Sequence, residues 1–575
     1  MKITTALLLL ISASCFAQKI VNYDTTFEKG NGNQTASYQQ TIEYYKLLAK
    51  DFKTISIQEM GLTDSGEPLH IVTFSADENF DFASIRKKNA IVLFNNGIHP
   101  GEPDGIDATM QLYRDLALGK ISVPKNTVLV TIPVYNIGGA LNRNSTTRVN
   151  QDGPEVYGFR GNARNYDLNR DFIKSDSRNT SSFAAIFQLL KPDVFIDNHV
   201  SNGADYQYKL TYIMTQQNKI GKILGDFMDK EMNEAVVQDL KKKELPMTPY
   251  VNAFSDTPDT GFTQFYDSPR YSTGYASLFN TIGYVVETHM LKNYQERVHA
   301  TYEFMRSILD YTDSNFKKIK EKRIANESLY KPGSKYALKY KIDSTSVTNF
   351  EFLGYEGRYK KSDVTSGDRL FYDRQKPFKK NIPYLKNYVP VDEITIPKAY
   401  IIPKGFWNII ALLKGNGLTV QQLEKDRLIP VESYKIEDYN TTSSPYEGHY
   451  LHRNTKVGTT VETIAFKKGD YIVSTEQAAV KYLLETLEPA AIDSFFNWNF
   501  FDTILQQKEG YSAYVFEDTA TKIIKDNPEI KKAFEQKKDS DEVFAKDAAA
   551  QLEWIYKNSA HYEKAHLQYP IYRMM

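Results

Sequence analysis

The chain has 575 residues, more than a single hydrophobic core usually organises, so its length predicts two domains. Its 71 lysines and arginines balance its 71 aspartates and glutamates, and this neutral balance argues against nucleic acid or an anionic membrane surface as the main partner. Hydrophobic residues make up 41% and charged residues 25% of the chain, as in ordinary soluble globular proteins.

The N-terminus has the layout of a secretory signal peptide. Lys2 gives a positive start, residues 7–11 form a short apolar core, and small residues follow. We expect cleavage after Ala17, so that residues 1–17 are removed. Cys15 offers an alternative, because lipoproteins are cut before a cysteine that becomes acylated, but the small residues before Cys15 fit that signal poorly. The sequence therefore predicts a secreted or periplasmic protein, with lipid anchoring as the weaker alternative.

The chain contains a single cysteine, Cys15. The mature protein is therefore expected to have no disulfide, no thiolate nucleophile and no cysteine-bound zinc or iron–sulfur site. Any metal ion must be held by histidine and carboxylate ligands. No later apolar run approaches the roughly 20 residues of a membrane span, so no stable span is expected.

Short apolar runs alternate with helical patterns from about Thr41 to Asp313. The apolar runs that predict strands are 90–94, 128–134, 194–196 and 284–286. Because these runs are continuous rather than alternating, they predict strands buried on both faces. Helical patterns between them, for example at 105–118 and 180–190, predict a three-layer α/β/α domain with a mixed, largely parallel sheet.

The pattern changes near residues 317–335, where a charged helical stretch ends in Lys331-Pro332-Gly333-Ser334 and indicates a linker. We place the first domain at 18–320 and a smaller α+β accessory domain at 335–575. The elements expected in the second domain are strands at 336–340 and 399–402 and helices at 407–414 and 476–487. Nothing in this domain predicts chemistry, so its role stays open.

Candidate metal ligands follow two of the predicted strands. In Gly97-Ile98-His99-Pro100-Gly101-Glu102, His99 and Glu102 come just after the first strand, at the carboxyl end where ligands bind in open α/β sheets. His199 ends another predicted strand and can reach the same edge. Two imidazoles and one carboxylate leave one zinc position open, as in catalytic zinc sites. The ordinary alternative for the first pair is a surface histidine beside a glutamate at a helix start.

Taken together, these motifs resemble the zinc carboxypeptidase family of the carboxypeptidase A type. The likeness runs from His99 to Glu287, roughly a third of the chain. Its blocks are His99-x-x-Glu102, Asp167-Leu168-Asn169-Arg170-Asp171-Phe172, Asp197-Asn198-His199 and Tyr284-Val285-Val286-Glu287-Thr288. The resemblance implies a zinc carboxypeptidase-like catalytic domain at 18–320, and one zinc ion (Zn2+) per chain held by His99, Glu102 and His199.

The resemblance also implies roles for the residues around the metal. Glu287 would be the general base that activates a water molecule and passes its proton to the leaving amine. Asn169 and Arg170 would grip the terminal carboxylate of the substrate, for which the planar fork of arginine is suited. Arg160 would polarise the scissile carbonyl, and Tyr271 would cover the substrate.

Alternatives remain for the arginine and the tyrosine. Arg143, Arg148 and Arg164 also precede the Asn-Arg pair. Arg160 is preferred because its position, nine residues before Asn169, resembles the spacing in the cytosolic carboxypeptidase branch of the family. Tyr266 and Tyr275 are close enough to Tyr271 in the sequence to be rivals.

Structural alternatives remain for the charged residues. Glu287 would then be a strand glutamate paired with a lysine or arginine, although a charge in so apolar a strand is unusual. Asp167 and Arg170 would form a structural ion pair. His289 faces the same side of its strand as Glu287, and ordinary packing is the preferred interpretation over a role near the metal.

The sequence therefore predicts a secreted zinc metallocarboxypeptidase that hydrolyses the C-terminal bond of peptides with a free carboxylate, with peptidoglycan stem peptides as one class. An N-acyl amino acid deacylase on the related fold is one alternative, against which the complete Asn169-Arg170 block argues. An inactive peptide-binding module is the other, although all four metal and base candidates are present. His99-Pro100-Gly101-Glu102 lacks the arginine of digestive carboxypeptidases, so the residue that is removed stays open.

Overall fold

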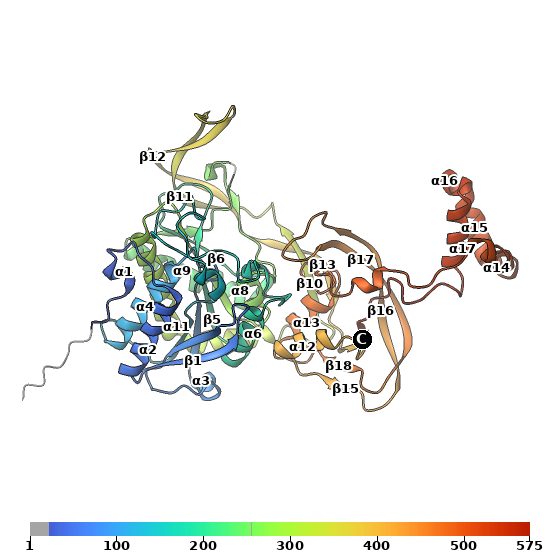
Figure 1. Ribbon diagram of the computed structural model, residues 1–575, viewed down its shortest axis with the longest axis horizontal. Coiled ribbons are helices and arrows are strands. Elements are labelled where there is room, and N and C mark those ends of the chain that lie inside the picture. Colours follow the sequence, from blue (N-terminus) through green and yellow to red (C-terminus); the bar gives the residue numbers. More distant parts are fainter. Residues whose placement is uncertain (1–21, 255) are drawn as a thin grey trace, which may run out of the picture.

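The computed structural model describes residues 22–254 and 256–575, so the expected signal peptide at 1–17, with Cys15, lies outside the described residues. An N-terminal α/β unit lies beside a C-terminal unit rich in strands (Figure 1). A long hairpin projects from the first unit, and short helices near the C-terminus lie at the far end of the second. Within the described ranges, no helix is both long and apolar enough to cross a membrane.

An eight-stranded mixed sheet, in the order β1-β2-β4-β3-β5-β9-β6-β7, organises the N-terminal unit. Its strands are β1 (Ile55–Leu62), β2 (Pro68–Phe74), β3 (Ala90–Asn95), β4 (Thr127–Ile132), β5 (Val194–Ser201), β6 (Leu210–Met214), β7 (Met247–Pro249) and β9 (Ile282–His289). The four strands predicted from continuous apolar runs are the parallel centre, β4-β3-β5-β9. Antiparallel pairs flank this centre, so the predicted mixed α/β sheet is confirmed.

Helices cover both faces of this sheet. They are α1 (Thr26–Lys29), α2 (Tyr38–Asp51), α3 (Phe82–Lys88), α4 (Asp104–Ala117), α5 (Ile137–Leu141), α6 (Arg178–Leu190), α7 (Gln217–Ile220), α8 (Lys222–Phe227), α9 (Asn233–Lys242), α10 (Ser272–Ser277) and α11 (Tyr294–Glu327). In β5, Phe195 packs against Phe183 of α6, whereas Asn198 reaches the sulfur of Met305 in α11. Because side chains alternate along a strand, α6 and α11 lie on opposite faces.

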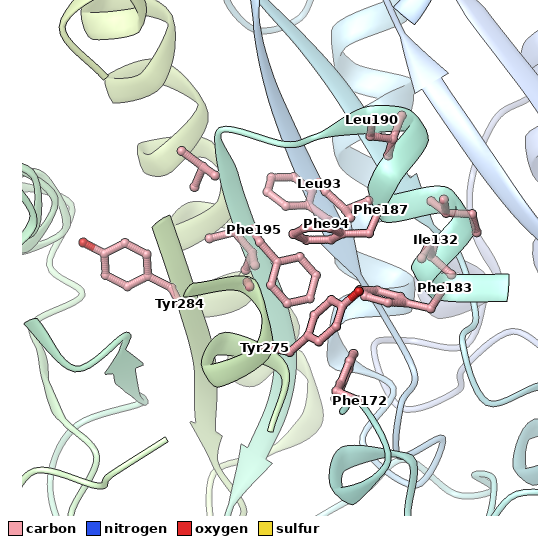
Figure 2. Close-up of a cluster of buried hydrophobic side chains, with 14 of the residues drawn as sticks. Leu93, Phe94, Ile132, Phe172, Phe183, Phe187, Leu190, Phe195, Tyr275 and Tyr284 are labelled. Atoms are coloured by element: carbon pink, nitrogen blue, oxygen red, sulfur yellow. The ribbon is translucent and has the colours of Figure 1, made fainter. Parts of the chain in front are cut away.

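An aromatic core on the α6 side holds the loop that carries the Asn-Arg pair (Figure 2). Phe172, directly after that loop, has its ring centroid 5.1 Å from that of Phe183 and 5.8 Å from that of Tyr275. All three side chains are buried, and each such burial contributes about 1.5–3 kcal/mol. Phe172 therefore fixes the loop to both α6 and α10.

Regular structure continues across the expected domain boundary. Helix α11 runs to Glu327, beyond the boundary placed at 320, and a short turn leads to β10 (Lys335–Ile342), which pairs with β13 (Tyr388–Thr395). Between them, β11 (Thr348–Lys361) and β12 (Asp368–Leu385) form the projecting hairpin. Strand β12 pairs with β8 (Phe262–Thr263), so the hairpin packs on the first unit. The division into 18–320 and 335–575 stays a prediction.

A six-stranded sheet, in the order β15-β18-β14-β19-β16-β17, forms the second unit. Its strands are β14 (Ala399–Ile402), β15 (Gln421–Gln422), β16 (Arg427–Thr441), β17 (His452–Phe466), β18 (Tyr471–Ser474) and β19 (Tyr572–Met574). Its helices are α12 (Trp407–Gly415) and α13 (Val480–Leu487), followed by the outlying α14 (Ala513–Asp526), α15 (Pro528–Ser540), α16 (Glu542–Lys546) and α17 (Ala548–Lys557).

The elements expected at 336–340, 399–402 and 407–414 are present. The helix expected at 476–487 begins only at Val480, so its first turn was predicted wrongly. Gln477 accounts for the difference, because its side chain accepts a hydrogen bond from the backbone of Thr419 at 2.9 Å and holds this segment as a turn.

Candidate metal and substrate site

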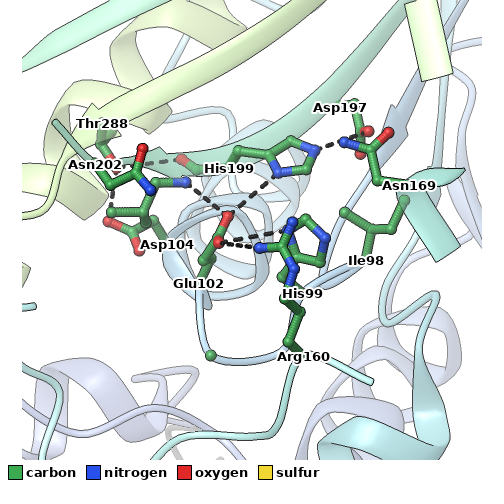
Figure 3. A network of polar contacts seen from close by, with 12 residues as sticks. Ile98, His99, Glu102, Asp104, Arg160, Asn169, Asp197, His199, Asn202 and Thr288 are labelled. Carbon is green, nitrogen blue, oxygen red and sulfur yellow. Dashed lines mark hydrogen bonds and ion pairs between the residues drawn. The ribbon is translucent and has the colours of Figure 1, made fainter. Parts of the chain in front are cut away.

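Three ligand side chains predicted from the sequence converge at the carboxyl ends of β3 and β5 (Figure 3). His99, Glu102 and His199 each offer one ligand atom, and these atoms lie within 4.8 Å of one another. His99 Nδ1 is 3.4 Å from Glu102 Oε1, and His199 Nδ1 is 3.2 Å from Glu102 Oε2. All three side chains are buried. The cluster has the composition and spacing of a site for one divalent cation.

The turn after β3 places the first two ligands on the same side. The chain leaves Asn95 and turns at Gly97, whose φ of 63° is a conformation that glycine adopts without steric cost. The carbonyl of His99 then accepts a hydrogen bond from the backbone of Glu102 at 2.8 Å. This turn explains why a histidine and a glutamate three residues apart reach the same point.

Aspartates hold the far ring nitrogen of each histidine. His99 Nε2 lies 2.9 Å from Asp167 Oδ1, and His199 Nε2 lies 2.9 Å from Asp197 Oδ2. Both rings therefore present Nδ1 to Glu102, and Nδ1 of His99 is buried without a hydrogen-bond partner. Carboxylates that orient imidazoles in this way are a regular feature of metal sites, and an unpartnered buried nitrogen calls for a ligand. The residues therefore fit a divalent metal ion.

The charges around the cluster favour a cation. Burial opposes a charge on His199, but the carboxylates of Asp197 and Glu102 outweigh burial and raise its pKa well above the ordinary value. Burial likewise opposes a charge on Glu102, but Arg148 and His99 hold its pKa well below the usual range. The carboxylates of Asp197 and Glu102 thus favour positive charge at His199, and a bound metal ion would supply positive charge there in place of a proton.

Glu287 lies directly beside the three candidate metal ligands. It is paired in register with His199 across the parallel strands β5 and β9. Burial raises the pKa of Glu287 to about 8, and the effects of His199 and Glu102 oppose each other. Among residues 22–254 and 256–575, no lysine or arginine forms an ion pair with Glu287. Arg160, whose charge lowers the pKa of Glu287, forms its ion pairs with Glu102 and Asp167 instead.

A cavity of about 420 Å³ opens over the cluster. Asn169, Arg170, Tyr271 and Glu287 all line it. Asn169 accepts a hydrogen bond from the backbone of Ser272 at 3.3 Å, which ties the Asn-Arg loop to α10. The guanidinium of Arg170 lies 4.6 Å from the centroid of the Tyr271 ring. Its Nη1 is 3.9 Å from Asp167 Oδ2, which is long for an ion pair. Arg170 thus faces the cavity and is not committed to a tight ion pair.

The four candidate arginines separate into two groups. Arg143 donates to backbone carbonyls, including that of Thr35 at 3.2 Å, and Arg164 donates to the carbonyl of Asp176 at 3.1 Å, so both are structural. Arg160 and Arg148 both line the cavity.

Arg160 and Arg148 reach the same carboxylate, that of Glu102. Arg160 donates to Asp167 at 2.9 and 3.0 Å and lies 3.6 Å from Glu102. Arg148 donates to Glu102 at 2.7 Å. The sequence names Arg148 among the candidates but prefers Arg160, because the position of Arg148 depends on a loop that no periodicity predicts.

Two of the three candidate tyrosines lie away from the cavity. Tyr275 is buried in the aromatic core, and its hydroxyl donates to Asn416 at 2.6 Å, while Tyr266 packs against Tyr388. Of the three candidate tyrosines, only Tyr271 lines the cavity.

His289 packs away from the cavity lining, whereas a further tyrosine borders the cavity. His289 contacts Asp205 at 3.1 Å and stacks on Tyr206, as ordinary packing predicts. Tyr250, one residue after β7, also lines the cavity and was not predicted. No local motif distinguishes it among 40 tyrosines.

Known proteins resemble this chain over most of its length. "Carboxypeptidase 2" of Trichophyton rubrum is 21% identical over 491 residues, which are 81% of this chain and 84% of that protein. "Carboxypeptidase 2" of Trichophyton tonsurans is also 21% identical, over 76% of this chain and 81% of that protein. No protein-family profile matches the chain. The resemblance to carboxypeptidases expected from the motifs is confirmed by these relatives.

Solved structures of metallo-carboxypeptidases also resemble part of the chain. A metallo-carboxypeptidase from Burkholderia cenocepacia is 16% identical, covering 48% of this chain and 70% of its own, with a TM-score of 0.36. A carboxypeptidase A from Helicoverpa armigera is 13% identical, covering 50% of this chain and 75% of its own, with a TM-score of 0.38.

Proposed function

We propose that the chain is a zinc-dependent metallocarboxypeptidase that hydrolyses the C-terminal bond of peptides outside the cytoplasm. The observation that supports this most is the position of Glu287, which lies beside His199 in a cavity whose lining also includes Asn169 and Arg170. The candidate metal ligands lie beside a carboxylate that forms no ion pair within the described residues, and beside a pair suited to bind a terminal carboxylate. This combination fits hydrolysis at the end of a peptide.

His99, Glu102 and His199 would hold the zinc ion. Bound zinc polarises carbonyl oxygens and lowers the pKa of a water molecule to about 7. Asp167 and Asp197 keep the two imidazoles in the orientation that presents Nδ1 to the ion.

The remaining residues bind the substrate and move its protons. Asn169 and Arg170 would receive the terminal carboxylate and so place the last peptide bond at the cluster. Arg160 would donate to the carbonyl oxygen as negative charge develops there. Glu287 would accept a proton from the attacking water molecule and return it to the leaving nitrogen. Tyr271 would cover the bound residue and exclude bulk water.

A peptide library with free and amidated C-termini tests this function. We expect single C-terminal residues to be released from the free peptides only, with loss of activity on chelation and recovery when zinc is returned. Stem peptides of peptidoglycan form one arm of the library, and N-acyl amino acids form another. Release of acyl groups without any release of C-terminal residues would replace the proposal by a deacylase.

The location of the protein outside the cytoplasm is proposed from the N-terminal sequence pattern alone. We expect the protein purified from outside the cytoplasm to begin at Gln18. A full-length chain retained in the cytoplasm, or a lipid-modified Cys15, would contradict that part of the proposal.

A further inference from the structure

A turn of the C-terminal unit reaches the candidate site. It connects β16 with β17, and its outer residues, Tyr446 and His449, pair through backbone hydrogen bonds of 2.7 and 3.1 Å. Glu447 and Gly448 lie at its tip with φ values of 49° and 81°. Two consecutive positive φ angles are typical of the tight type I′ turn. The 446–449 turn is therefore a compact element that presents Glu447 in a fixed position.

The tip of this turn holds the backbone at a central residue of the site. Glu447 Oε2 accepts a hydrogen bond of 2.9 Å from the backbone N–H of Asp167. The side chain of Asp167 in turn contacts His99 Nε2 at 2.9 Å and Arg160 Nη2 at 2.9 Å. Glu447 is therefore one residue removed from both a candidate metal ligand and the candidate carbonyl-binding arginine.

The same turn secures both ends of the segment that contains Asp167. A Cβ at Gly448 would meet the ring of Tyr166 at 3.1 Å, so glycine allows the turn to approach that ring closely. His449 Nε2 lies 2.7 Å from Asp176 at the other end of the segment. The segment forms only a short 3₁₀ turn of its own at Leu168–Arg170, so these contacts supply the rigidity that regular structure would otherwise give.

A second contact from the same unit holds the segment that carries Tyr271. The neighbouring Arg270 donates to buried Asp493 from its backbone at 2.9 Å and from Nε at 2.8 Å. Its guanidinium also lies 5.0 Å from the ring centroid of buried Trp498. The C-terminal unit therefore grips both segments that carry the proposed substrate-binding residues.

We propose that the C-terminal unit completes the substrate site, with Glu447 as a positioning residue for Asp167. The inference rests on the proposed function only where it names Asn169 and Arg170 as ligands of a terminal carboxylate. A hydrogen bond to an ionised carboxylate is about twice as strong as a neutral one. Without it, the Asp167 backbone would be free to shift, and both the imidazole of His99 and the Asn169–Arg170 pair would lose their fixed orientation.

Three variants of the full-length protein test this role. Glu447→Ala removes the acceptor, Glu447→Gln keeps an oxygen that can accept the same bond, and Glu437→Ala changes an exposed glutamate on β16 as the matched control. In the metal-free protein, hydrogen exchange of the peptide covering residues 160–172 is measured by mass spectrometry. We expect the slowest amides there to exchange about tenfold faster in Glu447→Ala, less than that in Glu447→Gln, whose neutral oxygen accepts a weaker bond, and at the original rate in Glu437→Ala.

Zinc affinity and kinetics provide the second readout. Glu447→Ala is expected to weaken zinc binding by roughly 3- to 10-fold, less than the 10- to 100-fold typical of a direct partner of a metal ligand. KM for peptides should rise more than kcat falls, and Glu447→Gln should restore both in part.

Two results would overturn the role of Glu447. One is unchanged exchange and zinc affinity in Glu447→Ala. The other is equal damage in Glu447→Ala and Glu437→Ala. Because exchange and zinc binding need no substrate, failure of the proposed function alone would leave this test intact.

Discussion

At the scale of single residues, Glu287 differs from the other carboxylates of the site. Asp167 and Asp197 are each bound to an imidazole, and Glu102 faces both imidazoles and Arg148. Glu287 borders the same cavity, and burial raises its pKa to about 8. A carboxyl group with a pKa near neutrality is suited to take up and return a proton.

Replacing this carboxylate by an amide gives the most direct test of the mechanism. Glu287→Gln keeps the size of the side chain but cannot accept the proton, so kcat is expected to fall by about 10²- to 10⁴-fold. Zinc content should stay at one ion per chain, because Glu287 is not among the ligands of the cluster. Turnover and metal stoichiometry are measured on the same preparation. Activity at the original level would exclude Glu287 as the base.

Asp197 allows the metal site to be tested apart from catalysis. Its carboxylate lies 2.9 Å from His199 Nε2 and fixes the ring that presents Nδ1 to Glu102. Asp197→Asn is expected to weaken zinc binding by about 10- to 100-fold, because an amide orients the imidazole less strongly. The affinity is measured by competition with a chelator, and Glu287→Gln is the control that should bind zinc normally. Equal affinities in the two variants would argue against the assigned ligand set.

At the scale of elements, helix α4 contains a buried aspartate, Asp107, that is not one of the candidate metal ligands. Burial raises the pKa of Asp107 to about 7, although hydrogen bonds with Thr35 and Tyr294 oppose the shift. An aspartate in the unfolded chain has a pKa of about 3.9. Between roughly pH 4 and pH 7 the folded state therefore binds more protons at Asp107 than the unfolded state, and this group makes stability fall as pH rises through that window.

The variant Asp107→Asn should remove this contribution. Asparagine keeps an oxygen for the Tyr294 hydroxyl but does not titrate, so the free energy of unfolding should decline less between pH 5 and pH 8 than in the wild type. Urea unfolding at both pH values gives the comparison. Asp539→Asn, at an exposed position on α15, is the control and should leave the decline unchanged. Identical declines in all three proteins would show that Asp107 is not protonated in the folded state.

Elements stabilised by local pattern were predictable from the sequence. The central strands β3, β4, β5 and β9 are buried on both faces, and their continuous apolar runs record that burial. The run at 128–134 extends two residues beyond the end of β4, because hydrophobicity marks burial and not the last hydrogen bond of a strand. The cluster of His99, Glu102 and His199 was predictable because His199 lies near the carboxyl end of β5 and the other two follow the carboxyl end of β3.

Contacts between distant segments were not predictable. Arg148, Tyr250 and Glu447 all lie on loops, and each reaches the site through a position that depends on the rest of the fold. The hairpin of β11 and β12 packs on the first unit through β8, although it lies beyond the expected linker. Spacing within one segment carries no information about such contacts, because they are set by how separate elements pack.

At the scale of the whole molecule, the helices α14–α17 form a separate body at the end of the second unit (Figure 1). They have a small core of their own, which includes Phe516, Phe534 and Phe544. The two ends of the segment lie close together, because Glu563 accepts hydrogen bonds from the backbones of Lys508 and Glu509 at 2.7 and 2.9 Å. The chain can therefore leave and rejoin the second unit at one place.

This arrangement predicts that the helical segment can be removed without loss of the site. Replacing residues 510–562 by a short glycine–serine linker should shift the Tm of the remaining protein by less than about 2 °C, since little apolar surface outside the segment's own core is exposed. Strand β19, which follows the segment and pairs with β14 and β16, is kept. Zinc affinity and peptide hydrolysis should match the full-length protein. A shortened chain that unfolds or loses zinc would show that these helices support the second unit, and through its 446–449 turn the site itself.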